Sequence, residues 1–499
     1  MSRLGLTMGL WAAVSGSALA QDPAEPTVEL EVFEAQRGDG TAVPADRGVL
    51  RVPIKRSNPD SKEIAIEFHR FRAEEGAPEG VPPVFFLNGG PGWPGLGAQA
   101  TSPEFYEESA ARFVELTDVV YVGQRGIGSS TNTPCGFFEP SPVDEPVERE
   151  VMAERVREAC RACREHWEGE GYDLTGLNVL EAAADVRDIA AALGYEQITL
   201  WGGSFGSHWG MAVQRKYPEL VARAVLNGME GPDHTYDMPS WVLNSLSRMA
   251  EQAEASPELE GLIPEGGLIA ALDQAIKRVE EEPVLFEVKD PRSRRMREVL
   301  ITADVIREAA KGVRNSVSSR RGMPTWPADM LAIHRGDYTS LAISALGDQG
   351  GRLPTASFFM LDCGSGISAE RKAILDADPA AKIVGALGAF YDTACSAWDA
   401  DLGADFRRNF ETDVPTVIVH GTFDVNTPFE NALELKPFFR ESKFITVHGG
   451  SHGALWEALD ESDEFSELMT EFLLSGDMVD LPDEIELAPI EWEVPSEEE

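Results

Sequence analysis

Residues 198–206 constrain the fold of this chain more than any other segment. Residues 198–201 are apolar or β-branched, which predicts a buried strand. Residues 202–206 then have Ser204 at the centre of a G-x-S-x-G pattern, and a helix-forming run follows and ends before Pro218. A strand, a tight turn and a helix in this order would hold the serine hydroxyl above a sheet. The segment therefore predicts a nucleophile, with an ordinary Gly-rich strand-to-helix loop as the alternative.

Short apolar runs alternate with helix-forming segments on both sides of Ser204. Helical spacing of apolar residues is clear over 180–193, whereas residues 28–33, 48–56 and 63–72 alternate apolar and polar residues as antiparallel strands do. The order predicts an α/β protein with the α/β-hydrolase fold, a doubly wound and mostly parallel sheet. The runs typical of strands covered on both faces are 84–87, 119–122, 198–201, 224–226, 416–420 and 444–447.

The alternation stops between residues 232 and 405, where the pattern is mainly helical. Because strands resume afterwards, we interpret this stretch as an inserted helical cap, or lid. The C-terminal tail is rich in Asp and Glu and has no Lys or Arg, so its last part is predicted to be solvated and mobile. The predicted organisation is a signal peptide (1–20), the first part of the core (21–231), the cap (232–405), the second part of the core (406–475) and the acidic tail (476–499).

The first twenty residues predict export. Arg3, a mostly apolar run over 4–13 and an A-x-A site at 18–20 follow the order of a secretory signal peptide. The apolar run is too short for a membrane span, and no later segment reaches about 20 apolar residues. The net charge of −42 argues against nucleic acid or an anionic membrane as a partner. We therefore expect a periplasmic or extracellular protein without membrane insertion.

The five cysteines fit an oxidising compartment. Cys160 and Cys163 have C-x-x-C spacing, but they lie in a charged helical run, and no second pair with zinc-ligand spacing is present. Structural disulfides are therefore favoured over a redox or zinc site. Because the number of cysteines is odd, one thiol is expected to remain outside the disulfides.

A nucleophilic serine requires a base and an acid that orients the base. In the α/β-hydrolase order both follow the serine, on loops after late strands. Asp424 follows the strand at 416–420, and His452 lies in the Gly-rich loop 449–453 after the last strand. The order Ser204, Asp424, His452 therefore predicts a catalytic triad. The alternative for Asp424 is a solvated loop aspartate.

An oxyanion hole requires two backbone N–H groups. Phe205, the residue after the predicted nucleophile, would supply one by its position. Residues 88–92, with the sequence NGGPG, follow an earlier strand and would supply the other, most directly from Gly90. The alternative is a turn selected only for its geometry.

Three segments together resemble a known family. Residues 88–92 are similar to the HGGPG box of proline iminopeptidases, residues 123–130 (GQRGIGSS) to their DQRGxGxS box, and residues 202–206 to their GGS[YF]G pattern. Asn88 stands where the family has His, and Gly123 where it has Asp. Neither position belongs to the triad, so these departures affect the expected mouth of the site rather than its catalysis.

Two further segments, 172–174 and 395–398, are more similar to the exported branch of this family, the tripeptidyl-aminopeptidase-like hydrolases. The resemblance covers residues 45–475. It implies an α/β-hydrolase core, a helical cap, no metal or organic cofactor, and release of residues from peptide N-termini. It also implies disulfides between Cys135 and Cys163 and between Cys363 and Cys395, with Cys160 free.

In this family, carboxylates at strand ends and in the cap hold the free ammonium group of the substrate. Glu230 and Asp233, just after the strand at 224–226, are placed for this role, although both are equally compatible with solvated loop acids. The leading interpretation is a serine aminopeptidase whose partner is a peptide or small molecule with a free N-terminus. An exported esterase or amidase with the same triad, and a non-catalytic binding protein on a hydrolase fold, are the alternatives.

Overall fold

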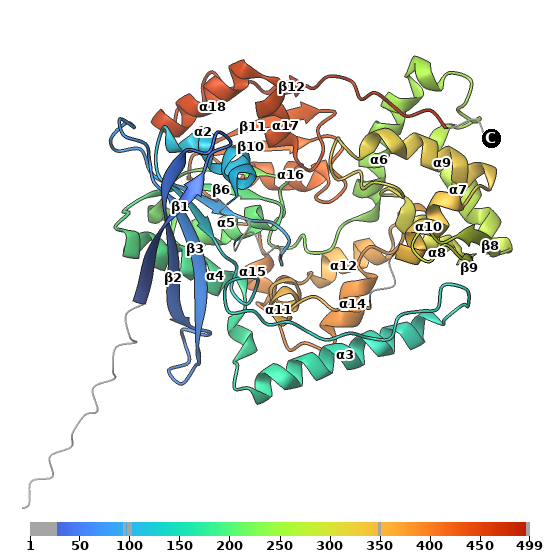
Figure 1. The fold of residues 1–499 in the computed structure, drawn as a ribbon, viewed down its shortest axis with the longest axis horizontal. Helices are drawn as coiled ribbons and strands as arrows, with labels where there is room; N and C mark the ends of the chain where they lie inside the picture. The colour runs from blue at the N-terminus through green and yellow to red at the C-terminus, as the bar shows by residue number, and fades with distance from the viewer. Residues whose placement is uncertain (1–26, 93–95, 97–101, 348–350, 496–499) are drawn as a thin grey trace, which may run out of the picture.

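The computed structural model describes residues 27–92, 96, 102–347 and 351–495. Figure 1 shows a core built around a sheet, with a largely helical lobe beside it. The predicted signal peptide, residues 1–20, lies outside the described residues. Across the part of the chain that the structure describes, no helix is long and apolar enough to cross a membrane.

A ten-stranded sheet forms the core, in the order β1-β2-β3-β5-β4-β6-β7-β10-β11-β12. The strands from β5 to β12 in this order pair parallel, whereas β1, β2, β3 and β5 pair antiparallel. The predicted α/β-hydrolase fold is thus confirmed. The strands are β1 (Thr27–Gln36), β2 (Ala42–Pro53), β3 (Glu63–Phe71), β4 (Val84–Leu87), β5 (Val119–Val122), β6 (Ile198–Gly203), β7 (Val221–Asn227), β10 (Thr416–Gly421), β11 (Ser442–His448) and β12 (Glu484–Glu486).

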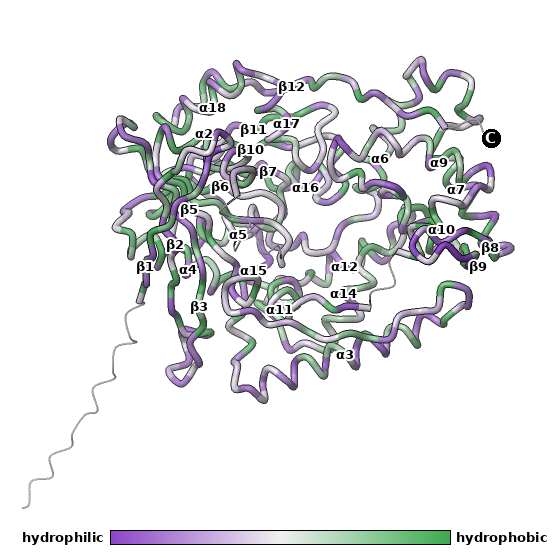
Figure 2. The backbone as a smooth tube through the Cα atoms, in the orientation of Figure 1, coloured by the Kyte–Doolittle hydropathy of each residue, from purple (hydrophilic) through white to green (hydrophobic). Residues whose placement is uncertain are grey.

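Helices cover both faces of the sheet. Successive residues of a strand point to opposite faces, so Phe85 of β4 packs in the cluster around α4 and α5, and Phe86 in the cluster around α17 and α18. Figure 2 shows hydrophobic segments gathered at these strands. Burial on both faces explains why the strands are continuously apolar. The core helices are α1 (Pro103–Phe105), α2 (Ala111–Val114), α3 (Arg149–Gly169), α4 (Val179–Leu193), α5 (Phe205–Lys216), α16 (Phe429–Leu435), α17 (Ala454–Glu461) and α18 (Asp463–Ser475).

The segment between β7 and β10 contains the predicted cap helices, and its two halves pack differently. The first half, with α6 to α10, has a hydrophobic cluster of its own. It includes a hairpin, β8 (Val284–Lys289) and β9 (Met296–Ile301), which the mainly helical prediction missed. In the second half, α11 contributes Phe359 and Met360 to the core cluster around α5. The cap helices are α6 (Pro239–Glu254), α7 (Gly267–Glu281), α8 (Ala303–Ala309), α9 (Trp326–Arg335), α10 (Thr339–Gly347), α11 (Ala356–Ser365), α12 (Ala369–Asp376), α13 (Ala381–Val384), α14 (Ala389–Cys395) and α15 (Ala404–Arg407).

The acidic tail is docked onto the protein through residues 484–492, which corrects the prediction of a solvated, mobile tail for this part, whereas residues 496–499 lie outside the described residues. Its β12 extends the sheet in parallel beside β11. Ile490 and Trp492 are then 8% and 5% exposed within the hydrophobic cluster of the cap. The tail therefore connects the sheet to the cap, as the red trace along the top of Figure 1 shows. Burial of these two apolar side chains stabilises the docked tail and outweighs the solvation of the acidic residues around them.

Both disulfides implied by the resemblance are present. Cys135 is bonded to Cys163 on α3, and Cys363 on α11 is bonded to Cys395 at the end of α14. Cys160 is a free thiol and is buried, with 0% exposure. Burial raises the pKa of this thiol to about 11, so it is neutral at physiological pH.

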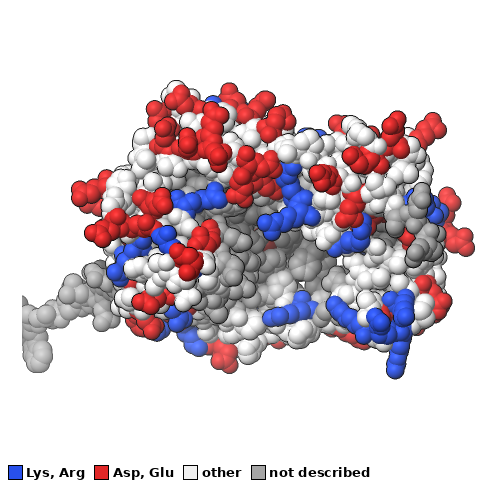
Figure 3. Space-filling view, turned by 45° about the horizontal axis from the view of Figure 1, so that its top comes forward, with Lys and Arg blue, Asp and Glu red and all other residues white. Residues whose placement is uncertain are grey.

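Acidic side chains are spread over both lobes on the face seen in Figure 3, and a hollow lies between the lobes. This distribution agrees with the net charge of −42. The carboxyl ends of the parallel strands are where ligands bind in open α/β sheets. These strand ends are therefore the place to look for the predicted site residues.

Candidate active site

Ser204 occupies a strained turn between β6 and α5. Its backbone has φ 56° and ψ −133°, a conformation that non-glycine residues rarely adopt. A Cβ added at Gly202 would lie 2.3 Å from the carbonyl oxygen of Gly206, and one at Gly206 would lie 1.9 Å from that of Leu87. Both glycines of the G-x-S-x-G pattern are therefore required by close backbone contact. The turn has the strand–turn–helix geometry that was predicted, and its strained backbone favours a nucleophile over an ordinary Gly-rich loop.

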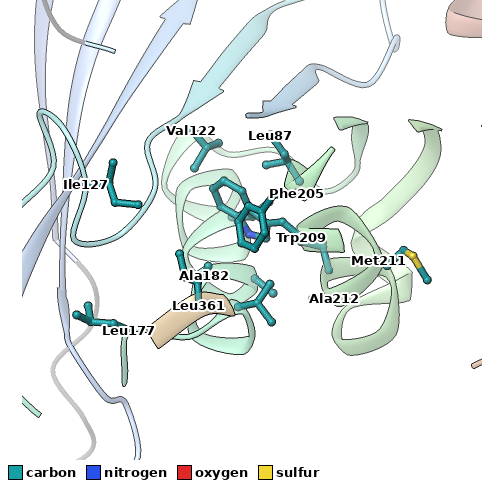
Figure 4. Close-up of a cluster of buried hydrophobic side chains, with 14 of the residues drawn as sticks. Leu87, Val122, Ile127, Leu177, Ala182, Phe205, Trp209, Met211, Ala212 and Leu361 are labelled. Atoms are coloured by element: carbon teal, nitrogen blue, oxygen red, sulfur yellow. The ribbon is translucent and has the colours of Figure 1, made fainter. Parts of the chain in front are cut away.

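The residue after Ser204 fixes the start of α5 in the core. Phe205 is 1% exposed, and Figure 4 shows its ring beside Trp209, below Leu87 and Val122. Phe205 is also the first residue of the helix. Its backbone N–H therefore has no partner within the helix. This N–H therefore has the position predicted for an oxyanion donor.

The loop at 88–92 passes directly over Ser204. A Cβ added at Gly89 would lie 3.0 Å from Cβ of Ser204 and 3.5 Å from its Oγ. The next residue, Gly90, has a φ of 113°, which only glycine adopts readily. The structure thus brings the loop of the second predicted oxyanion donor to the serine.

Asp424 and His452 form a hydrogen-bonded pair. Nδ1 of His452 lies 3.0 Å from Oδ1 and 2.9 Å from Oδ2 of Asp424. The carboxylate also accepts the backbone N–H groups of Asn426 and Thr427 at 2.9 and 3.0 Å, and the Thr427 hydroxyl at 2.8 Å. Asp424 is 1% exposed, so the alternative of a solvated loop aspartate is wrong.

The two groups stabilise each other's charge. Burial disfavours the ionised form of Asp424, but the charge and hydrogen bond of His452 outweigh it and lower the pKa of Asp424 to about 2. Burial also opposes protonation of His452, but the Asp424 carboxylate again outweighs it, so the pKa of His452 lies above its ordinary value. Asp424 is therefore ionised at neutral pH and holds the proton on Nδ1, which leaves Nε2 as the basic nitrogen.

Asn227, at the end of β7, ties the Ser204 turn to the His452 loop. Its backbone carbonyl accepts the N–H of Ser204 at 3.0 Å, and its side-chain amide donates to the carbonyl of His452 at 3.0 Å. The next residue, Gly228, lies against the imidazole, since a Cβ there would be 3.0 Å from Cε1 of His452. The three residues predicted as a triad therefore lie at one place in the fold.

Glu230, Asp237 and Asp362, here called the acidic cluster, interact electrostatically with one another, and Asp237 also interacts with Asp424 and His452. Burial and the neighbouring charge of Asp362 raise the pKa of Glu230 well above its ordinary value. Burial, supported by Asp424, raises the pKa of Asp237 to about 6, and burial raises the pKa of Asp362 to about 7. Their raised pKa values favour the neutral forms, and a bound cation such as an ammonium group would favour the ionised forms instead.

The sequence predicted only one member of the acidic cluster, Glu230. Asp237 lies further along the same loop and has no motif of its own. Asp362 lies on α11, where the hydroxyl of Tyr391 donates to its Oδ2 at 2.7 Å. Only the packing of α11 on the core brings Asp362 to the cluster, so no local pattern marks it.

Asp233, the other predicted substrate-binding residue, is hydrogen-bonded to the cap. Its carboxylate accepts the backbone N–H and the hydroxyl of Ser368, at 2.6 and 2.5 Å. Ser368 is the N-cap residue of α12. The carboxylate thus anchors the cap to the loop after β7, because two strong hydrogen bonds already engage it. The structure thus gives Asp233 an anchoring contact, and its role in substrate binding stays a prediction.

Two family matches agree with this geometry. Residues 82–295 match the alpha/beta hydrolase fold family, and residues 382–483 match the family described as TAP-like protein. The chain therefore belongs to the α/β-hydrolase superfamily by its fold. Its C-terminal part is similar to the TAP-like family within that superfamily.

The similar proteins include two named peptidases. A tripeptidyl aminopeptidase of Streptomyces coelicolor is 28% identical over 199 residues, which are 38% of this chain and 36% of that protein. The serine protease Hip1 of Mycobacterium tuberculosis is 26% identical over 195 residues, 37% of this chain and 36% of that protein. The aligned part thus spans about a third of these relatives. Among solved structures, the esterase EaEST of Exiguobacterium antarcticum has a TM-score of 0.36 at 14% identity, covering 83% of this chain and 96% of that one.

Proposed function

We propose that the protein is a serine aminopeptidase that releases one or a few residues from peptide N-termini. The observation that carries this proposal is the acidic cluster beside the Asp424–His452 pair. A buried ammonium group requires a charged partner, because an unpaired charge at such a site costs several kcal/mol. Carboxylates at low exposure next to the nucleophile meet this requirement for the N-terminus of a peptide. The names of the two relatives support the same class of substrate.

The reaction begins when Nε2 of His452 accepts the proton of the Ser204 hydroxyl and Oγ attacks the carbonyl carbon. The N–H groups of Phe205 and Gly90 stabilise the resulting oxyanion. His452 then gives the proton to the leaving amine, and an acyl-enzyme remains on Ser204. Water, activated by the same imidazole, hydrolyses this ester and restores the serine. Asp424 orients the ring throughout and stabilises its positive charge.

We also propose that the protein is exported. The support comes from residues 1–20, which have the order of a secretory signal, and from the two disulfides. Mass spectrometry of the protein recovered from the periplasm or medium should find a mature N-terminus near residue 21. Recovery only from the cytoplasm, with residues 1–20 retained, would contradict export.

The aminopeptidase proposal is tested by comparing peptide anilides with a free and an acetylated N-terminus, and a neutral ester. Acetylation leaves the carboxylates without their partner, so kcat/KM should fall about 10²-fold or more, from roughly 3 kcal/mol of lost pairing. Glu230→Gln should remove most of this preference and spare the ester. Asp233→Asn is the matched control, because that carboxylate binds Ser368, and the preference should persist. Equal rates on free and acetylated peptides would favour the esterase alternative.

A further inference from the structure

The turn after β5, residues 123–128, contacts the loop that passes over Ser204. Gln124 in this turn is 4% exposed. Its Oε1 accepts the backbone N–H of Gly92 at 2.9 Å, and its Nε2 donates to the carbonyls of Asn88 and Gly89 at 3.0 and 2.8 Å. A single side chain therefore binds three backbone groups across residues 88–92. The proposed mechanism assigns Gln124 no chemical step.

The loop at 88–92 has little else in its sequence to hold it in one conformation. Three of its five residues are glycine, and Gly90 and Gly92 have φ values of 113° and 103°. Glycine loses more conformational freedom on ordering than other residues. An oxyanion hole, in contrast, depends on donors that are fixed before the charge develops. The loop therefore needs a partner from outside it, and Gln124 is placed as that partner.

Gln124 is itself held rigidly by its two neighbours in the sequence. The N–H of Gly123 donates to the carbonyl of Glu67 on β3 at 2.8 Å, and a Cβ at Gly123 would lie 2.5 Å from the same oxygen. This close contact explains why glycine occupies position 123. Arg125 is 1% exposed and donates to Asp185 on α4 at 2.8 and 2.7 Å. The turn is thereby anchored to the sheet on one side and to α4 on the other.

We propose that Gln124 is a positioning residue, which fixes the loop 88–92 so that the backbone N–H of Gly90 points at the oxyanion. This inference rests on the proposed function, because it assumes that the loop stabilises a negative charge on the substrate. The recorded hydrogen bonds of the Gln124 side chain are to backbone groups of the loop, not to the side chains of Ser204, Asp424 or His452. Its contribution is the order of the loop before the reaction starts.

Gln124→Leu tests the proposal, since it removes all three hydrogen bonds with little change in volume. The kcat for whichever substrate the wild type hydrolyses, peptide anilide or ester, should fall about 10²-fold with KM within about threefold. Affinity for an aminoacyl boronic acid, whose serine adduct is tetrahedral, should fall by a similar factor. Hydrogen exchange measured by mass spectrometry should be faster in peptides covering 88–92.

Gln214→Leu is the matched control. Gln214 is also a buried glutamine, 1% exposed, and its Oε1 accepts the hydroxyl of Thr412 at 3.2 Å, near the far end of α5. This variant should lose less Tm than Gln124→Leu, because it removes one hydrogen bond rather than three, and should keep kcat, boronate affinity and exchange at 88–92 close to wild type. A merely structural role for Gln124 would lower Tm but leave kcat and boronate affinity close to wild type in both variants.

The outcomes separate the two proposals. Unchanged kcat and unchanged exchange at 88–92 in a folded Gln124→Leu protein would overturn the role of Gln124 and leave the proposed function intact. Faster exchange without loss of kcat or boronate affinity would also overturn it, because the order that Gln124 gives to the loop would then not be needed to stabilise the oxyanion. A wild-type protein that hydrolyses neither substrate and binds no boronate would overturn the proposed function, and the positioning role with it.

Discussion

Both carboxylate oxygens of Asp424 lie within hydrogen-bonding distance of Nδ1 of His452, at 3.0 and 2.9 Å. The hydroxyl of Thr427 lies 3.2 Å from the same nitrogen and donates to Oδ2 of Asp424. The carboxylate is therefore fixed by its own loop before it meets the imidazole. A proton on Nδ1 is the arrangement that this geometry favours, and it leaves Nε2 free to act as a base.

Replacing the carboxylate by an amide should reverse the tautomer. In Asp424→Asn the side-chain amide presents a donor toward Nδ1, which would favour the proton on Nε2. We expect kcat to fall about 10³- to 10⁴-fold with the fold retained. Steady-state kinetics and near-UV circular dichroism check both parts. Activity within tenfold of wild type would show that Asp424 does not set the tautomer.

Ser204→Ala should abolish turnover and leave the fold unchanged, because only a hydroxyl at the surface of the turn is lost. Loss of a triad member costs about 10⁴-fold or more in rate. A fluorophosphonate probe should label the wild type and fail to label the variant. Ser247→Ala on α6, whose hydroxyl donates to the carbonyl of Leu243, is the control and should label normally. Labelling of Ser204→Ala at the wild-type rate would place the nucleophile elsewhere.

Asp237→Asn should shift the acid limb of the pH dependence of kcat/KM to lower pH. The charge of Asp237 contributes to the raised pKa of His452, although burial opposes protonation and Asp424 has the larger effect. Without this charge the pKa of His452 falls, so its imidazole stays neutral to lower pH. The acid limb of the kcat/KM profile for a neutral ester should therefore shift to lower pH. Asp460→Asn, at a surface ion pair with Arg112, should not shift it. An upward shift would contradict the assigned geometry.

Asp362→Asn should stabilise the protein at neutral and alkaline pH. The folded state raises the pKa of Asp362 from an ordinary 3.8 to about 7, so the native state binds a proton more tightly than the unfolded chain. Stability from this group is present below about pH 4 and is lost as the pH rises toward 7. The variant should gain roughly 2–3 kcal/mol at pH 8 and nothing at pH 3.5. Urea unfolding at both pH values measures the difference, and destabilisation at pH 8 would contradict it.

The Cys363–Cys395 disulfide should stabilise the second half of the cap. The two residues are separated by 32 positions, and closing such a loop is worth roughly 3–4 kcal/mol in the chain-entropy model. Replacing both by Ala should lower the free energy of unfolding by about that amount. Alkylation of the wild type in denaturant without reductant should label Cys160 alone. Labelled Cys363 in that experiment would contradict the pairing.

Much of the core and of the triad was accessible from the sequence, because both depend on local patterns. Strands buried on both faces must be continuously apolar, and the turn at Ser204 needs glycines where its backbone contacts Leu87 and the rest of the turn. The chain order of Ser204, Asp424 and His452 follows from the fold, since each occupies a loop at the carboxyl end of a parallel strand. The order of the strands therefore determined which loops meet.

Only the tertiary structure decided which carboxylates surround the site and what holds it. Glu230 and Asp233 are close in sequence and equal in charge, yet one faces the acidic cluster and the other binds Ser368. Asp362 and Gln124 make contacts with residues far away in the chain. No local sequence pattern indicates such contacts. The tail was predicted from its charge to be free, but burial of Ile490 and Trp492 outweighs the solvation of the acids around them. Charge and local pattern describe each segment by itself, whereas long-range packing determines its partners.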